Sequence, residues 1–397
     1  MTLRVLACAV AAVALPAVSF ARQDPPAPAP RPTGLVWGGE FAAAVSRPDD
    51  DAFFNYTDYE HSTLRQFRMR LMLEQRLPAR VDLLGEVRLE NDLLNAPALF
   101  VRWQPWAARP LHIQAGRLPL TVGAFARRAY GSDNLLVGVP LVYQYLTSVR
   151  PDALPQTADD MLRMRARGWR PSYPLGSDAL ASGLPVVAYS RGDTGVQMQW
   201  TASTWTAAAA VTRGTATDPR VRDNNSGVTV SSRLAMMRPS GLTVGVSGAR
   251  GSWVGRSVMS LLSTAQQERS TAQTLVGVDT EFARGHWILR GEWWHSRFDV
   301  PTLTQTLSAT GGFAEARYRF LPRWQVSARA DRLAFSKLTG AQSGSASWDA
   351  PLWRAEGAIG YRVSRYVDLR AGYQFNWREA GRVRQRGFPT LQALIWF

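Results

Sequence analysis

The last ten residues, 388–397, read FPTLQALIWF, and this stretch decides the fold. In an extended strand, successive side chains point to opposite faces. One face then holds Leu391, Ala393, Ile395 and Phe397, and the other holds Thr390, Gln392 and Leu394. The sequence therefore predicts a final amphipathic strand that ends on an aromatic pair with no polar tail, which is rare in soluble proteins.

The same alternation forms a hairpin near the start of the chain. Apolar Phe67, Met69, Leu71 and Leu73 alternate with Gln66, Arg68, Arg70 and Glu74. After a turn at residues 77–80, Val81, Leu83, Val87 and Leu89 alternate with Asp82, Glu86, Arg88 and Glu90. Each strand has about the 10 residues that a tilted strand needs to cross a bilayer. One face is apolar and the other carries full charges.

Further alternating segments predict strands along the whole chain. They lie at about 35–45, 194–202, 204–213, 226–237, 241–250, 272–282, 286–295, 310–320, 323–334, 351–362, 365–377 and 388–397. A soluble β-sandwich shows the same local pattern with its apolar face packed inside. Short turns such as 238–241 alternate with long loops such as 213–225, 251–270, 295–308 and 336–349, and this asymmetry is typical of outer-membrane barrels.

The predicted fold class is all-β, a transmembrane antiparallel β-barrel of 16 strands. Eighteen strands are the alternative, because Pro119 and Pro185 interrupt the alternation at residues 111–127 and 185–191. Either number leaves a water-filled lumen, since barrels of about 16 to 18 strands are too wide for side chains to fill.

Three short stretches carry a family resemblance. The strand ending at Phe397, the sequence IQAGR at 113–117 with Pro119 and Gly123, and DNLL at 133–136 resemble parts of the phosphate-selective porins and their relatives. The resemblance implies a Gram-negative outer-membrane porin, commonly a homotrimer, whose last strand is read by the barrel-assembly machinery and whose neighbours are outer-membrane lipid and lipopolysaccharide. That group combines an arginine ladder with vestibule lysines, but Lys337 is the only lysine here.

The N-terminus predicts export and three segments. Arg4, the apolar run 5–18 and the small-x-small site at 19–21 predict a signal peptide at residues 1–21. Residues 22–34 are proline-rich and predict a periplasmic tether, and residues 35–397 form the predicted barrel. Cys8, the only cysteine, lies within the signal peptide, so neither a disulfide nor a thiol site is expected.

The charge is basic and carried by arginine. The chain has 46 Lys+Arg against 31 Asp+Glu, and removing Arg4 with the signal peptide leaves a net charge of +14. Such an excess suits nucleic acid, acidic lipid or a path for anions. Nucleic-acid binders usually gather this charge in runs or on one helix face. Here the arginines are spread singly through alternating segments, so no nucleic-acid partner is expected.

A long irregular region at residues 127–184 predicts an inward-folded constriction loop. It is too apolar for a solvated tail, and loops above about 15 residues in compact domains are usually functional or disordered. It resembles the constriction loop of general porins. Thr157 is expected to cap a short helix that leads into Arg163, Arg165, Arg167 and Arg170. These four arginines either line the constriction or form a solvated external face.

Strand parity supplies the second set of candidate pore-lining residues. The lumen face is expected to carry Arg68, Arg70, Arg88, Arg102, Arg290, Arg317, Arg319, Arg329, Arg354 and Arg370. An arginine at mid-depth on the lipid face would cost roughly 2 to 4 kcal/mol, so the assignment is well constrained. The arginines either form a ladder that passes anions along or pair with the acidic residues beside them to stiffen the wall.

The sequence predicts a passive diffusion channel for small hydrophilic solutes with anion preference, and no enzyme. One alternative is a structural or adhesive barrel that acts through its long loops. The other is a barrel hydrolase, for which His295 and Asp299 are the best rim pair. No metal-ligand spacing and no phosphate-binding glycine loop occur, so we expect neither a metal nor a cofactor.

Overall fold

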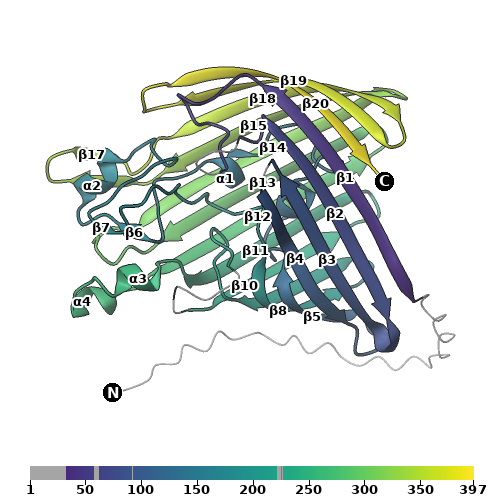
Figure 1. Ribbon diagram of the computed structural model, residues 1–397, viewed down its shortest axis with the longest axis horizontal. Helices are drawn as coiled ribbons and strands as arrows, with labels where there is room; N and C mark the ends of the chain where they lie inside the picture. Colours follow the sequence, from purple (N-terminus) through teal and green to yellow (C-terminus); the bar gives the residue numbers. More distant parts are fainter. Residues whose placement is uncertain (1–32, 58–61, 92, 221–224, 226) are drawn as a thin grey trace. The chain divides into compact units, whose positions relative to one another are not determined.

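Sixteen antiparallel strands pair in sequence order and close into a barrel, as predicted by the first of the two strand counts. The structure is a computed structural model that describes residues 33–57, 62–91, 93–220, 225 and 227–397 (Figure 1). The predicted signal peptide at 1–21 and residues 22–32 of the predicted tether lie outside the described residues. Within Thr33–Phe397, which form one compact unit, no described helix is long and apolar enough to span a membrane.

The barrel strands are 8 to 15 residues long. They are β1 (Gly34–Ser46), β2 (Gln66–Leu77), β3 (Val81–Glu90), β4 (Leu93–Trp103), β5 (Leu111–Leu118), β8 (Asp193–Thr201), β9 (Trp205–Thr212), β10 (Thr229–Met237), β11 (Leu242–Ser252), β12 (Ala272–Arg284), β13 (Trp287–Phe298), β14 (Leu307–Leu321), β15 (Trp324–Phe335), β18 (Leu352–Ser364), β19 (Val367–Arg378) and β20 (Gln385–Trp396). Strand β1 begins at Gly34, which the prediction gave to the tether.

Three connections differ from the sequence prediction. The connection predicted at 295–308 is shorter, because β13 runs to Phe298 and β14 begins at Leu307. The loop predicted at 336–349 contains a small hairpin of β16 (Lys337–Gly340) and β17 (Gly344–Ser347). Residues 185–191 form no strand, so β5 pairs directly with β8. The long connection therefore spans residues 119–192, beyond the predicted 127–184, because β5 ends just before Pro119.

The two faces of each strand differ sharply in polarity. On β2, outward Phe67 and Met69 are 41% and 45% exposed, whereas inward Arg68 is 5% exposed. Exposed apolar residues and buried charged residues reverse the arrangement of a soluble sandwich. The outer face therefore suits lipid, and the charges face the barrel interior.

The seam between the first and last strands closes the barrel. Ala43 of β1 stands opposite Ala393 of β20, and the N–H groups of Gly39 and Phe397 each donate to the other's carbonyl at 3.1 Å. The Phe397 ring meets Trp37 edge-on with ring centroids 5.6 Å apart. A side chain on Gly39 would overlap the Phe397 ring, so the seam requires a glycine there.

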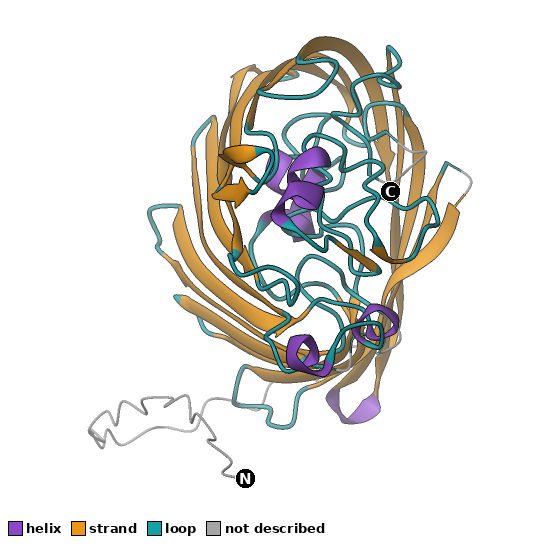
Figure 2. Cartoon of the chain, turned by 90° about the vertical axis from the view of Figure 1, so that its left-hand side faces the viewer, coloured by secondary structure: helices purple, strands orange, loops and turns teal. Residues whose placement is uncertain are grey.

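The connection of residues 119–192, called here the inward loop, folds into the barrel (Figure 2). It contains η2 (Phe125–Arg128), α1 (Leu141–Gln144), β6 (Ala153–Leu154), α2 (Ala158–Arg163) and β7 (Leu175–Gly176). Short helices α3 (Arg256–Met259) and α4 (Thr264–Gln267) lie in a later loop. Leu141 and Val142 of α1 join the same buried cluster as Trp294 and Leu333 of the wall, all 0% exposed. The apolar core therefore lies between the inward loop and the inner wall.

Candidate functional site

Carboxylates of the inner wall hold the inward loop by its main-chain N–H groups. Glu40 of β1 accepts from the N–H groups of Gly131 and Ser132, at 2.9 and 2.8 Å. Glu292 of β13 accepts from the N–H groups of Ala124 and Phe125, at 2.9 and 2.6 Å. Two more such bonds run from Gly138 to Glu356 and from Leu141 to Asp331, at 2.8 and 3.0 Å. Buried backbone donors need such partners, so the acidic residues of the wall fix the path of the loop.

Arginines of the wall bind the carbonyl groups of the same loop. Arg370 of β19 donates to the carbonyls of Gly131 and Asn134, both at 2.9 Å. Arg354 of β18 donates to the carbonyl of Val139 in this loop and to that of Phe54 in the loop after β1, both at 2.8 Å. Arg290 and Arg88 add bonds to the carbonyls of Asp133 and Ser190, at 2.7 and 2.9 Å. These guanidinium groups are therefore used to anchor main chain.

Ion pairs within the wall take up further charge. Arg329 reaches Glu356 at 2.7 Å, Asp331 at 3.2 Å and Glu315 at 3.5 Å. Arg329, Arg354 and Arg370 are at most 5% exposed. These three side chains are held in ion pairs or hydrogen bonds, so their predicted pore-lining role stays a prediction.

Asp349 lies in the connection between β17 and β18 and joins this connection to the inward loop. Its carboxylate accepts from the N–H groups of Ser148 and Ala166, at 2.8 and 2.9 Å, and from the Tyr145 hydroxyl at 3.1 Å. Burial raises the pKa of Asp349, and these N–H donors oppose the rise. The inward loop is thus held by a connection between strands as well as by the strands of the wall.

The helix predicted after Thr157 forms, with a capping box between Thr157 and Asp160. Neighbouring Asp159 accepts from the N–H groups of Ala341, Gln342 and Ser343 in the β16–β17 turn, at 2.9, 3.1 and 2.7 Å. The side-chain and backbone bonds from Ser343 hold the pKa of Asp159 below its usual range. The hairpin tip is therefore clasped to the start of α2.

The four arginines predicted around α2 lie near these external loops. The Arg163 side chain is 65% exposed and pairs with Asp160 of the same helix. Arg165 lies 3.4 Å from Glu379, and Arg167 and Arg170 are exposed. All four lie at the end of α2 or just after it, and none of them belongs to a barrel strand.

The inner wall of β2 and β4 stays partly open, unlike the wall at Arg329, Arg354 and Arg370 of β15, β18 and β19. The side chain of Arg70 is 15% exposed and that of Arg102 is 26% exposed, and inward Met72 is 38% exposed. Arg317 and Arg319 of β14 are also partly exposed. Among the ten predicted wall arginines, these four and Arg290 retain contact with open space.

A pocket of about 130 Å³ lies between the wall of β2–β4 and both ends of the inward loop. Its charged lining consists of Arg70, Glu86, Arg88, Arg127 and Arg191. Glu86 is already paired with Arg70 at 3.0 Å and with Arg88 at 2.8 Å. In the described part of the chain, Arg127 and Arg191 form no ion pair, and both are exposed. The pocket thus carries an excess of positive charge.

Tyr130 forms one side of this pocket. The guanidinium groups of Arg68, Arg70 and Arg88 stand over its ring at 4.7, 4.5 and 4.1 Å from the centroid. Its hydroxyl is buried and has no hydrogen-bond partner within the described residues. Burial raises the pKa of Tyr130 to about 12, so it remains a donor.

Arg127 stays protonated at neutral pH. Its side chain is exposed to the lumen but surrounded by protein, and this desolvation together with the nearby Arg233 lowers the pKa of Arg127 to about 10. The sequence reasoning missed Arg127, Tyr130 and Arg191 as pocket residues, because strand parity applies only to strands. The available signal was that Arg127 and Arg191 stand near the two ends of the irregular region.

The rim pair considered for hydrolysis is not assembled. His295 Nδ1 bonds the Thr310 hydroxyl at 2.8 Å. Asp299 instead pairs with Arg297 at 3.3 Å and accepts from the Ser270 hydroxyl at 2.7 Å. Over the described residues, no group of histidine and acidic side chains is placed to hold a metal ion.

The sequence matches no protein-family model and no curated protein. The structure is similar to that of Salmonella typhi OmpF, solved in complex with daunomycin, at 12% identity over 92% of this chain and 98% of that chain, with a TM-score of 0.57. An anion-selective porin from Comamonas acidovorans matches at 10% identity over 92% and 99%, with a TM-score of 0.55. The outer-membrane channel DcaP of Acinetobacter baumannii matches at 9% identity over 92% and 96%, with a TM-score of 0.53. The chain therefore has the closed antiparallel barrel fold of Gram-negative outer-membrane porins.

Proposed function

We propose that the protein is a passive diffusion channel for small hydrophilic solutes that prefers anions and lies in a bacterial outer membrane. The arginine-rich pocket beside the inward loop carries this proposal. Arg127 and Arg191 reach it without an acidic partner among the described residues. Guanidinium groups in a confined, partly dehydrated path attract anions strongly and exchange them between neighbouring donors.

Neutralising the two unpaired pocket arginines tests the site. We expect an Arg127→Gln, Arg191→Gln double variant to keep conducting in a planar bilayer, with its reversal potential shifted away from the chloride value. Potassium chloride gradients at low salt give the cleanest reading, because screening is weak there. Arg365→Gln is the matched control, since Arg365 lies exposed in the turn before β19.

The result separates the two parts of the proposal. A wild-type channel that favours potassium would overturn anion preference but leave diffusion intact. An unchanged reversal potential in the double variant would move the filter elsewhere, and an Arg163, Arg165, Arg167 triple neutralisation then tests the α2 entrance as the filter.

A structural or adhesive barrel is the second candidate. It is favoured by the apolar core, in which Leu141, Val142 and Val187 of the inward loop are 0%, 0% and 0% exposed and fill part of the lumen. Its long loops would then carry the function. A folded protein that never conducts in lipid supports this candidate, or the barrel hydrolase, over the channel.

The proposed partners follow from the barrel. They are outer-membrane lipid and lipopolysaccharide on the apolar outer face, the barrel-assembly machinery at the strand before Phe397, and small anions in the lumen. A homotrimer is proposed because one similar structure is titled as a trimer form of Vibrio cholerae OmpT, with a TM-score of 0.52. Native mass measurement in mild detergent tests the oligomer.

A further inference from the structure

The pocket of about 130 Å³ beside Tyr130 has a charged side and an apolar side. Its uncompensated charge comes from Arg127 and Arg191. The apolar side is lined by five residues without a polar side-chain atom: Pro97, Ala98, Pro119, Leu120 and Ala126. Two of these are prolines, which also lack a backbone N–H. An inorganic anion in the pocket would therefore find few donors on the apolar side.

The main chain on both sides of Arg191 is held against the wall. Arg88 of β3 donates to the carbonyl of Ser190 at 2.9 Å. On the other side, a side chain at Gly192 would overlap the carbonyl oxygen of Pro97, so a glycine is needed where the loop end lies against β4. The position of Arg191 at the pocket is therefore fixed by its two neighbours.

Arg127 is held in the same way at the other end of the inward loop. The N–H group of Phe125, two residues before it, donates to Glu292 at 2.6 Å. The N–H group of Gly131, four residues after it, donates to Glu40 at 2.9 Å. Because both backbone segments are anchored before any ligand arrives, little ordering of the site is left to oppose binding.

Tyr130 adds a hydrogen-bond donor that the protein itself does not use. The residue is 3% exposed, and its hydroxyl has no hydrogen-bond partner within the described residues. Its ring is already occupied by the guanidinium groups of Arg68, Arg70 and Arg88. A buried hydroxyl without a partner is costly. An acceptor oxygen on a ligand in the pocket would remove this cost.

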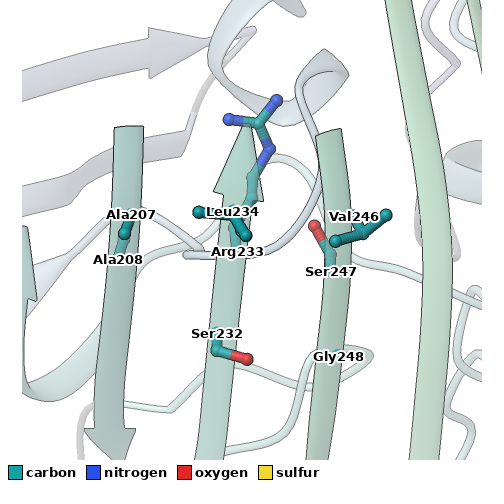
Figure 3. A pocket seen from close by; sticks show the side chains of 8 residues that line it. All are labelled: Ala207, Ala208, Ser232, Arg233, Leu234, Val246, Ser247 and Gly248. Carbon is teal, nitrogen blue, oxygen red and sulfur yellow. The ribbon is translucent and has the colours of Figure 1, made fainter. Parts of the chain in front are cut away.

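A larger hollow of about 350 Å³ at β9–β11 lacks this combination (Figure 3). It is lined by residues from both faces of these strands, such as Ala208 and Leu234, and its one charged lining residue is Arg233. The Arg233 Nε lies 3.0 Å from a carboxylate oxygen of Asp279. The charge at this hollow is therefore already neutralised, which leaves the pocket beside Tyr130 as the better site for an anion.

The size of the pocket limits the apolar part of a ligand. An apolar cavity of about 150 Å³ can hold one benzene molecule, and this pocket measures about 130 Å³. One aromatic ring or a short alkyl chain therefore fits, provided that the charged group of the ligand reaches towards the exposed Arg127 and Arg191. The ring would displace water from the side that Pro119 and Leu120 line.

We propose that this pocket binds a small hydrophobic monocarboxylate, with an aryl carboxylate as the best fit. The carboxylate contacts Arg127 and Arg191 and accepts a hydrogen bond from the Tyr130 hydroxyl, and the ring lies against Pro119 and Leu120. Guanidinium groups bind carboxylates with paired, charge-assisted hydrogen bonds. This inference deepens the proposed channel function and rests on it, since it names the class of anion that the site selects.

Calorimetric titration of the full-length detergent-purified protein at low salt tests the proposal. The probes are benzoate, acetate, inorganic phosphate and neutral benzamide. Benzoate should bind roughly tenfold more tightly than acetate, because burying an aromatic ring is worth about that factor or more. Benzamide has the ring without the charge and should show no saturable binding, which also corrects for uptake into micelles. Phosphate or acetate binding as tight as benzoate binding overturns the proposal.

A Tyr130→Phe variant tests the place of the carboxylate. The change leaves no other group unpaired, because the hydroxyl has no partner within the described residues. Benzoate affinity should fall roughly tenfold, as expected for a hydrogen bond to a charged group. Tyr366→Phe is the matched control, since Tyr366 is 43% exposed in the turn before β19. Equal benzoate affinity in the two variants overturns the assigned position.

A Leu120→Asn variant tests the apolar side without a change of charge. It should lower the affinity for benzoate more than the affinity for acetate, and an equal loss for both ligands overturns the role of this side. Leu180→Asn is the matched control, because Leu180 is 54% exposed in the same inward loop and does not line the pocket.

The titration does not depend on conduction, so the two proposals can fail separately. A channel that prefers chloride but binds benzoate no better than acetate contradicts this inference and leaves the proposed function standing. A protein that binds benzoate as expected but favours potassium in the bilayer contradicts the anion preference and leaves the pocket assignment standing.

Discussion

Arg354 shows how one side chain joins three parts of the molecule. Its Nε donates to Asn376 Oδ1 at 2.6 Å, and its two other nitrogens donate to the carbonyls of Val139 and Phe54, both at 2.8 Å. The three acceptors belong to the wall, the inward loop and the loop after β1. Only a planar guanidinium presents donors in these three directions at once.

We expect Arg354→Lys to destabilise the fold. A lysine ammonium retains the charge but leaves buried acceptors unpaired, and each costs about 1 to 3 kcal/mol. Thermal unfolding in detergent, followed by circular dichroism, measures the loss. Arg332→Lys is the control, since Arg332 is exposed on the outer face. Equal midpoints for the two variants would contradict the anchoring role.

Asp49, in the loop after β1, gives a pH-dependent prediction. It is 2% exposed, and burial raises its pKa to about 7, against opposing attraction from Arg354 and Arg378 and a hydrogen bond from the Asn55 N–H. An unfolded Asp releases its proton near pH 4. The folded state therefore holds the extra proton between about pH 4 and about pH 7, and stability falls as pH rises through that window.

Asp49→Asn removes this dependence. The variant should gain stability relative to wild type as pH rises from about 4 to about 7, by up to roughly 4 kcal/mol, and the difference should level off above that. Unfolding midpoints of both proteins across pH give the comparison. Asp51→Asn is the control in the same loop, with a side chain that is 52% exposed. A difference that does not change with pH would refute the assignment.

At the scale of elements, the β16–β17 hairpin and α2 act as a pair. Asp159 caps the hairpin tip through the N–H groups of Ala341, Gln342 and Ser343. We expect Asp159→Ala to speed hydrogen exchange at residues 337–347 and to leave the barrel strands unchanged. Asp178→Ala provides the control, because Asp178 is an exposed aspartate of the same inward loop.

The strands could be predicted from the sequence, and the loops only in part. Alternation reports which side of a strand faces lipid, so Arg68 and Phe67 were assigned to the correct faces. The hairpin at β16–β17 was missed because Lys337 to Ser347 lacks a sustained apolar face. The anchoring bonds were missed for a different reason. They end on main-chain groups of residues such as Gly131 and Gly138, and no side-chain pattern marks a backbone donor or acceptor.

At the scale of the whole molecule, barrel closure depends on the seam at Gly39. We expect Gly39→Val to displace the Phe397 ring and to destabilise the barrel. In gel electrophoresis, the variant should stop migrating as the compact folded form at a lower temperature than the wild type. Ala43→Val is the matched control on the outward face of the same strand, opposite Ala393. An unaltered transition in Gly39→Val would show that the terminal ring can be repacked without loss.

The bonds between charged wall residues and the loop backbone also bear on which sequence changes the inward loop can tolerate. Every residue except proline offers the same N–H and carbonyl groups, so substitutions in the inward loop can change its side chains while Glu40, Glu292, Arg354 and Arg370 keep their partners. The fold of the inward loop thus depends on its backbone, and its side chains are left free to vary. If the proposed channel function holds, substitutions in the inward loop are expected to alter permeation without altering the barrel.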